Sequence, residues 1–114
     1  MKVLIVDDNQ LLQTRLTSAL NKNNADIVIC HALNCKEARR LFHTFSPDNV
    51  VLDISLPDGS GISLLQEFKK NDPAAKVFMF TNFPSDEFRQ RCFELGADDF
   101  FDKSNMKELL KTII

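Results

Sequence analysis

The chain has 114 residues, of which 44% are hydrophobic and 26% charged, as in ordinary soluble globular domains. This length allows one domain with its own core and excludes two. Fourteen basic and sixteen acidic residues give a net charge of −2, which argues against direct contact with nucleic acid or a membrane surface.

Apolar runs of about five residues are far shorter than a membrane-spanning helix, and no secretory leader is recognised. Three cysteines do not suggest a disulfide framework. These features indicate a cytoplasmic domain.

Short β-branched or aromatic runs alternate along the chain with segments whose apolar residues recur at helical spacing. The expected strands begin near residues 2, 26, 49, 76 and 99. The expected helices carry these apolar stripes in turn: Leu12, Leu16, Ala19 and Leu20; Ala38, Leu41, Phe42 and Phe45; Ile62, Leu65 and Phe68; Phe88, Cys92 and Leu95; Met106, Leu109, Leu110 and Ile113.

Polar residues predict where several helices begin and end. Asn34 and Asn105 each precede a glutamate by three residues, a pattern typical of helix starts, and Ser85 is a third expected N-cap. Gly96 is placed for a left-handed C-terminal cap.

Five strands alternating with helices indicate repeated right-handed βαβ units. We therefore predict an α/β, doubly wound, five-stranded parallel sheet of the flavodoxin-like order 2-1-3-4-5, with helices on both faces. No hairpin or linker is expected.

Reactive side chains follow four of the five expected strands. The first ends at Asp7-Asp8, the third at Asp53 and the fourth at Thr81, and Lys103 follows the fifth. The carboxyl ends of parallel strands share one edge of the sheet, so these side chains are expected to converge there.

Three converging carboxylates would raise one another's pKa unless a cation is present. Mg²⁺ prefers such oxygen ligands. Asp53 could then accept a phosphoryl group as an acyl phosphate, while Lys103 and Thr81 supply a charge and a hydroxyl donor to the phosphoryl oxygens.

Simpler interpretations exist for several of these residues. Asp7 and Asp8 could merely cap the first helix, and Asp98-Asp99 is most simply a solvated pair. Phe83, Phe88 and Phe101 are expected to lie partly outside the apolar stripes, on a partner surface. A zinc cluster is not favoured, because these four residues lack the usual ligand spacing: Cys30, His31, Cys35 and His43.

Several motifs together resemble the receiver domain of two-component response regulators, over the whole chain. They are Asp7-Asp8, Asp53, Leu-Pro-Asp-Gly-Ser-Gly at 56–61, Phe-Thr at 80–81, Gly-Ala-Asp-Asp-Phe at 96–100, and Lys103. The resemblance is closer to the subgroup often coupled to helix-turn-helix outputs.

The resemblance implies a role for each site residue. Asp53 would be the phosphoacceptor. Mg²⁺ would be bound by Asp8, Asp53 and the main-chain carbonyl of Ser55, with Asp7 acting through water. Thr81 and Lys103 would contact the phosphoryl group, and Phe100 would be the switch aromatic.

The implied function is phosphorelay signalling. A sensor histidine kinase or a histidine phosphotransfer protein would donate the phosphoryl group. The surface of the fourth helix, fifth strand and fifth helix would meet an effector or a second copy. The domain would catalyse only its own phosphorylation and dephosphorylation, and is otherwise not an enzyme.

Three positions depart from the commonest family pattern. Ser104 stands where many receivers have a cis-proline, so we expect that loop to be held differently. Asn82 stands where a small residue is common and would restrict access to the phosphoryl group. Phe100 lacks the hydroxyl of the frequent tyrosine.

Two other functions compete with the receiver interpretation. A pseudoreceiver that only binds partners would not need the complete set of site residues. A Mg²⁺-dependent aspartyl-phosphate phosphohydrolase commonly has a second acid two residues after its nucleophile, where this chain has Ser55.

The apolar end, Thr112-Ile113-Ile114, further predicts that a single receiver domain over residues 1–114 continues into more helix, a linker or an effector.

Overall fold

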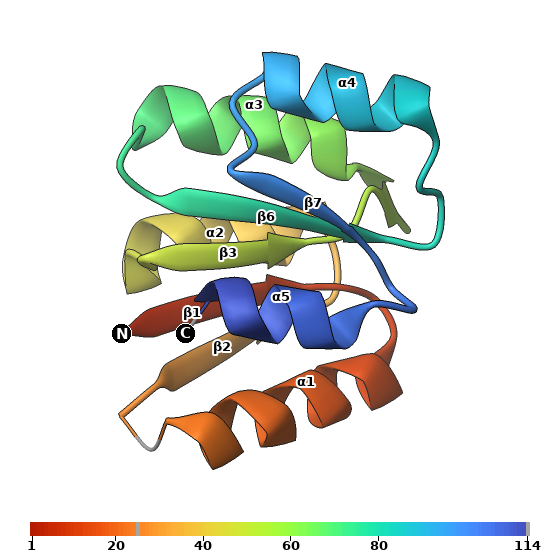
Figure 1. Cartoon of the computed structure of the whole chain (residues 1–114). Helices are drawn as coiled ribbons and strands as arrows, with labels where there is room; N and C mark the ends of the chain where they lie inside the picture. Colours follow the sequence, from red (N-terminus) through yellow and green to blue (C-terminus); the bar gives the residue numbers. More distant parts are fainter. Residues whose placement is uncertain (25, 114) are drawn as a thin grey trace.

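The computed structural model describes residues 1–24 and 26–113. Their elements, shown in Figure 1, are β1 (Lys2–Val6), α1 (Gln10–Asn23), β2 (Val28–Ala32), α2 (Cys35–Phe45), β3 (Asn49–Leu52), β4 (Ser55–Leu56), β5 (Gly59–Ser60), α3 (Gly61–Asn71), β6 (Lys76–Thr81), α4 (Asp86–Glu94), β7 (Asp99–Asp102) and α5 (Met106–Ile113). Ile114, on which the expectation about the apolar chain end partly rests, lies outside the described residues.

The five longer strands form one parallel sheet in the order β2-β1-β3-β6-β7. Counted along the chain this is the predicted order 2-1-3-4-5, so the predicted α/β, doubly wound fold is confirmed. The second strand begins at Val28 rather than near residue 26. None of the helices described here has the length and apolarity to cross a membrane.

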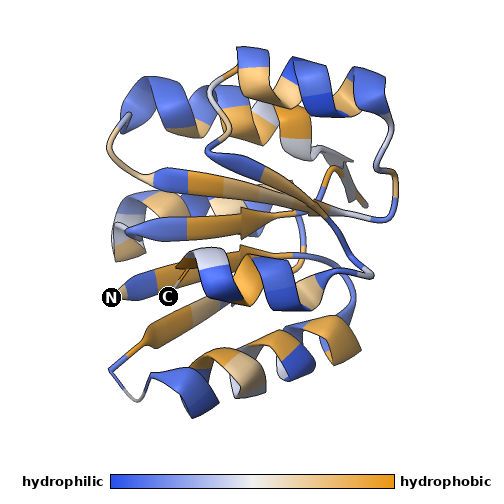
Figure 2. Cartoon of the chain, in the orientation of Figure 1, coloured by the Kyte–Doolittle hydropathy of each residue, from blue (hydrophilic) through white to orange (hydrophobic). Residues whose placement is uncertain are grey.

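The two faces of the sheet are buried by different helices. Leu4 and Val6 pack with residues of α2 and α3, while Val3 and Ile5 pack with residues of α1 and α5. Figure 2 shows the resulting pattern, apolar strands between helices that are polar on their outer sides. Successive strand residues point to opposite faces, so a sheet covered on both faces needs continuous apolar strands.

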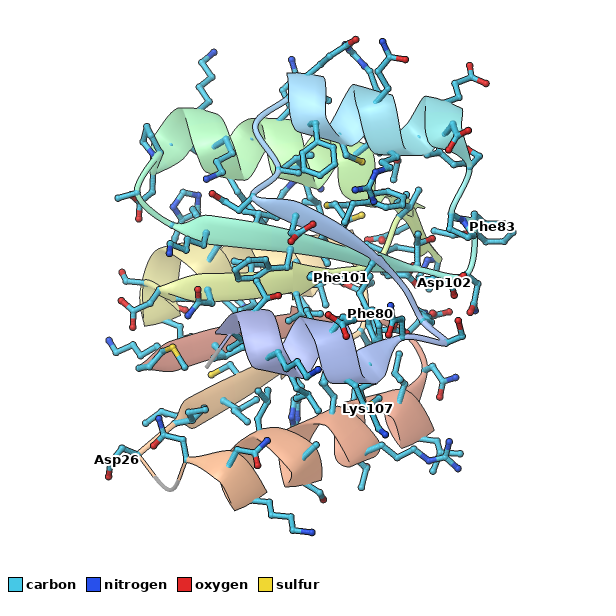
Figure 3. All side chains as sticks on the ribbon, viewed as in Figure 1. Asp26, Phe80, Phe83, Phe101, Asp102 and Lys107 are labelled. Atoms are coloured by element: carbon cyan, nitrogen blue, oxygen red, sulfur yellow. The ribbon has the colours of Figure 1, made fainter. Side chains whose placement is uncertain are left out.

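The same alternation corrects one expectation about the phenylalanines. Phe101 is buried, at 9% exposure, beside Phe80 on the α1–α5 face (Figure 3), so placing it on a partner surface was wrong. Phe83 and Phe88 are 56% and 38% exposed, as expected. Figure 3 shows Phe83 pointing outward from the β6–α4 connection.

Most of the predicted helix ends are confirmed. The side chains of Asn34 and Ser85 accept hydrogen bonds from the backbone N–H groups three residues on, and Gly96 has a φ of 99°. α5 begins directly after Asn105, as expected, but no hydrogen bond joins Asn105 and Glu108 in the part of the chain described, so the pair does not cap the helix. The Asn105 N–H donates instead to the Asp102 carbonyl, at 2.8 Å.

A short hairpin contradicts the expectation that none is present. β4 and β5 pair antiparallel around Pro57-Asp58. The Asp58 carboxylate accepts hydrogen bonds from the backbone N–H groups of Cys35 (2.7 Å) and Lys36 (3.1 Å), which hold the hairpin at the start of α2. These bonds lower the pKa of Asp58. Burial, with a further contribution from Asp58, raises the pKa of the Cys35 thiol to about 11.

Asp98 is exposed, as expected, but its carboxylate is also bonded to other elements. Its Oδ2 atom accepts a hydrogen bond from Val77 N at 2.8 Å and lies 2.7 Å from Lys69 Nζ. Asp98 therefore joins α3, β6 and the turn before β7.

Candidate functional site

Three carboxylates meet at the carboxyl edge of the sheet. Asp7 follows β1 and Asp53 follows β3, its neighbour in the sheet. One oxygen from each of Asp7, Asp8 and Asp53 lies within 4.8 Å of the other two. Asp7 and Asp53 are only 2% and 5% exposed, whereas Asp8 is exposed to solvent. The predicted convergence of the three acids is confirmed.

Lys103 completes this group from the loop after β7. Its Nζ atom lies 2.7 Å from Asp7 Oδ2 and 3.0 Å from Asp53 Oδ2. The Lys103 backbone N–H donates to the Thr81 carbonyl at 2.9 Å, which continues the β6–β7 pairing into the loop. A single ammonium group therefore forms ion pairs with two buried carboxylates.

The pKa values reflect this crowding. Burial raises the pKa of Asp53 above its ordinary value, and the negative charge of Asp7 adds to the rise, although Lys103 partly offsets both. Burial alone would lower the pKa of Lys103, but its bonds to Asp7 and Asp53 outweigh burial and raise it. Three acids against one lysine leave excess negative charge, which favours binding of a further cation.

The loop that carries Asp7 and Asp8 is held by its own neighbours. Asn9, not either aspartate, caps α1, because its side chain accepts the Leu12 N–H at 3.1 Å. Asp7 Oδ1 accepts the Asn9 N–H at 2.9 Å. The simpler interpretation of Asp7 and Asp8 as helix caps was therefore wrong.

Gln13 supports the same loop and was missed in the sequence. This buried side chain donates through Nε2 to the carbonyls of Ile5 (2.9 Å), Asp7 (3.2 Å) and Ala32 (3.2 Å). The sequence did contain a signal for this role, because Gln13 lies on the same face of α1 as the buried residues Leu16 and Leu20. A glutamine at a core position indicates buried backbone groups that need a partner.

The donor atoms of the site suit a hard divalent cation. Carboxylate oxygens without sulfur or imidazole are the ligands that Mg²⁺ prefers. Among the residues described, only Asp7, Asp8 and Asp53 form a group of this kind. The disfavoured zinc cluster gains no support, because His31 is exposed and bonded to Thr17, whereas Cys30 packs against the core on the other side of β2.

Neither of the two predicted switch residues, Thr81 on β6 and Phe100 on β7, bonds to the acids in the described structure. Thr81 is fully buried at the end of β6, and its Oγ1 accepts the Phe83 N–H at 3.0 Å. Phe100 is buried on the face covered by α2, α3 and α4. Ser55, the predicted carbonyl ligand, begins β4 directly after the Asp53–Ile54 segment.

Gly61 approaches the site's backbone so closely that no side chain fits. Its N–H donates to the Ile54 carbonyl at 2.7 Å, and a Cβ at this position would overlap the Asp53 carbonyl oxygen. Gly61→Ala is therefore expected to displace the Asp53 segment and lower the free energy of unfolding by about 1–3 kcal/mol, as overpacking commonly does.

Urea unfolding of the two glycine variants Gly61→Ala and Gly59→Ala measures this effect. At Gly59 the nearest contact of a new Cβ would be the Cys35 side chain, at 3.3 Å, rather than backbone. Equal stability of Gly61→Ala and Gly59→Ala would contradict the prediction.

The fold and site together define an α/β domain with a lysine-paired cluster of acids at the carboxyl edge of a doubly wound sheet. The family model of the response regulator receiver domain matches residues 3–114. The chain therefore belongs to the response regulator receiver domain family, as the sequence motifs predicted.

Known relatives agree with this assignment. The response regulator protein VraR of Staphylococcus aureus is 30% identical over 104 residues, which cover 91% of this chain and 50% of VraR. The chain thus spans about half the length of the curated relatives it matches.

Solved structures are also similar. The signal receiver domain of a DNA-binding response regulator from Colwellia psychrerythraea has a TM-score of 0.93 and 30% identity, over 99% of this chain and 94% of that one. The BeF₃-activated DrrB receiver domain has a TM-score of 0.86 and 28% identity, over 98% and 92%.

Proposed function

We propose that this receiver domain accepts a phosphoryl group on Asp53 in a Mg²⁺-dependent reaction and changes conformation to regulate an output. The observation that carries the proposal is the position of Asp53. Its buried carboxylate shares one lysine with Asp7 and forms, with Asp7 and Asp8, a group of oxygens that could hold a cation.

The donor would be a phosphohistidine of a sensor kinase or a phosphotransfer protein in the cytoplasm. An Asp53 carboxylate oxygen forms the new bond to phosphorus as the phosphorus–nitrogen bond of the donor breaks, and the histidine leaves with that electron pair. Asp8, Asp53 and the Ser55 carbonyl would hold Mg²⁺, with Asp7 acting through water. Bound Mg²⁺ supplies neutralisation of charge on the phosphoryl oxygens.

This chain's own residues would then respond to the added charge. Lys103 Nζ is 3.0 Å from Asp53 Oδ2, so it is placed to pair with a phosphoryl oxygen. The Thr81 hydroxyl would turn toward the phosphoryl group and leave room for Phe100 to move. The result is a population shift that alters the α4–β7–α5 surface, where an effector or a second copy would bind.

Phosphorylation by a small acyl phosphate tests the proposal. With Mg²⁺, intact-protein mass spectrometry should show one added phosphoryl group per chain, and chelation by EDTA should reduce its formation to the background level. The EDTA sample restored with excess Mg²⁺ is the matched control.

Other outcomes would favour the competing functions. No adduct in the presence of Mg²⁺ would overturn the proposal and favour a pseudoreceiver. Rapid multiple turnover of a metabolite phosphate would favour a hydrolase, although Ser55 replaces the second acid that such enzymes commonly carry.

A further inference from the structure

Helix α4 is attached to the domain by few buried side chains. Of its residues Asp86–Glu94, only Cys92 is buried. Two of its phenylalanines, Phe88 and Phe93, are exposed. Helices with little buried surface belong to the least stable parts of a domain, so individual contacts have a large influence on where such a helix lies.

Arg89 links α4 to β7 through its guanidinium group. Its Nη1 atom donates a hydrogen bond to the Phe100 carbonyl at 3.2 Å. Its guanidinium carbon lies 5.8 Å from the centre of the Phe100 ring and 5.1 Å from that of Phe93. Both distances are within the range of cation–π attraction.

The position of Phe100 at the edge of the sheet explains why this contact matters. β7 is an edge strand. The Phe100 N–H donates to Asp99 Oδ1 at 2.8 Å, and its carbonyl accepts from Arg89. Both main-chain groups of Phe100 are therefore held by side chains at the free edge, where no further strand fixes them.

We propose that Arg89 is a positioning residue that restrains Phe100 against α4 and so opposes the phosphorylation-linked rearrangement. This inference rests on the proposed function. In the structure the Thr81 hydroxyl accepts a hydrogen bond from Phe83 N, and a turn of Thr81 toward a phosphoryl group would break this bond. Movement of Phe100 into the space left by Thr81 would break its contacts with Arg89.

The restraint can be measured directly because the chain contains no tyrosine or tryptophan. Phe100→Tyr introduces a single fluorescent side chain at the position in question. In this background and without a phosphoryl group, Thr81 still closes the inner space, so Arg89→Ala uncovers the outer face of the ring. It should at least double the acrylamide quenching constant of the tyrosine, and Arg89→Lys should have a smaller effect.

Arg91→Ala is the matched control in the quenching experiment. Arg91 is an exposed arginine of the same helix, and its ion pair is with Glu94, within α4. Its replacement should leave the quenching constant unchanged. Equal quenching in the Arg89→Ala and Arg91→Ala variants would overturn the proposal.

The energetic consequence is tested with native Phe100. Beryllofluoride is titrated into the protein with Mg²⁺, and binding is monitored by ¹H–¹⁵N spectra. Arg89→Ala should bind beryllofluoride about 5-fold more tightly than wild type does, a typical magnitude for coupling between two sites. Arg91→Ala should bind as wild type does. Unchanged or weaker binding to Arg89→Ala would contradict the opposing role.

The two measurements separate failure of this inference from failure of the proposed function. If wild type binds no beryllofluoride at Asp53, the proposed function fails, and the opposing role of Arg89 fails with it. If wild type binds beryllofluoride but Arg89→Ala binds no more tightly, only the inference fails. Circular dichroism melts confirm that each variant is folded, and Arg89→Lys provides the test if Arg89→Ala does not fold.

Discussion

Asp53→Asn is expected to abolish formation of the phosphoryl adduct to the detection limit of intact-protein mass spectrometry. An amide oxygen of asparagine is a far weaker nucleophile than a carboxylate and cannot form an acyl phosphate. The replacement keeps the shape of the side chain, so Lys103 can still pair with Asp7, at 2.7 Å.

Two other aspartate variants make this result specific. Asp26→Asn changes an exposed residue at the end of the domain away from the site (Figure 3) and should leave phosphorylation unchanged. Asp8→Asn keeps the acceptor but removes one expected metal ligand, so it should raise the Mg²⁺ concentration needed. An undiminished adduct in Asp53→Asn would show that another residue is the acceptor.

The same variant should also be more stable than wild type at neutral pH. The pKa of Asp53 is raised in the folded state, chiefly by burial. Its ionised form therefore destabilises the fold at pH values above that raised pKa. This destabilisation decreases as the pH falls and the carboxyl becomes protonated, and it vanishes below the ordinary aspartate pKa of 3.8.

Thermal melts at two pH values measure this difference. Asp53→Asn should melt above wild type at pH 7, and the two should converge near pH 3. A variant that melts below wild type at pH 7 would mean that the Asp53–Lys103 pair outweighs the cost of burying the carboxylate.

The acids and the lysine were predictable because they depend on local pattern and simple topology. Asp7, Asp53 and Lys103 follow expected strands, and the strand order makes β1 and β3 neighbours. A parallel sheet then brings strand ends together whatever the details of packing. Motif resemblance added the proposed individual roles, including that of Ser55.

Residues that depend on partners distant in sequence were not predictable in the same way. Asp58 caps α2 from 23 residues away, and Gln13 bonds to the Ala32 carbonyl from a different element. The sequence did not single out Arg89, because its partner is a carbonyl at a sheet edge. The prediction for Phe101 was wrong because β7 has only four residues, too few to show from the sequence which side chains point to which face of the sheet.

Lys103→Met is expected to lower the free energy of unfolding by about 3 kcal/mol at pH 7, as removal of one partner from a buried ion pair commonly does. Methionine keeps a long, flexible stem but removes the charge that serves Asp7 and Asp53. The Lys103 side chain is only 11% exposed, so water replaces little of the lost interaction.

The pH dependence follows from the sign of the lysine shift. The pKa of Lys103 is raised in the folded state above its ordinary value of 10.5, because its bonds to Asp7 and Asp53 outweigh the lowering by burial. As long as the carboxylates are ionised, the stabilisation is therefore fully present below pH 10.5 and is lost as the pH rises through the raised value. Urea unfolding at pH 7 thus measures the whole effect.

Low pH and Mg²⁺ should each reduce the loss of unfolding free energy caused by Lys103→Met, because protonation or a divalent cation neutralises the unpaired carboxylates. The gap from wild type should narrow below about pH 4, where carboxyl groups take up protons. Lys107→Met, which changes an exposed lysine on α5 (Figure 3), should neither lose stability nor gain stability from acid or Mg²⁺ in this way. If Lys103→Met were destabilised equally with and without Mg²⁺, the loss would come from packing of the lysine stem. The acids would then not depend on its charge.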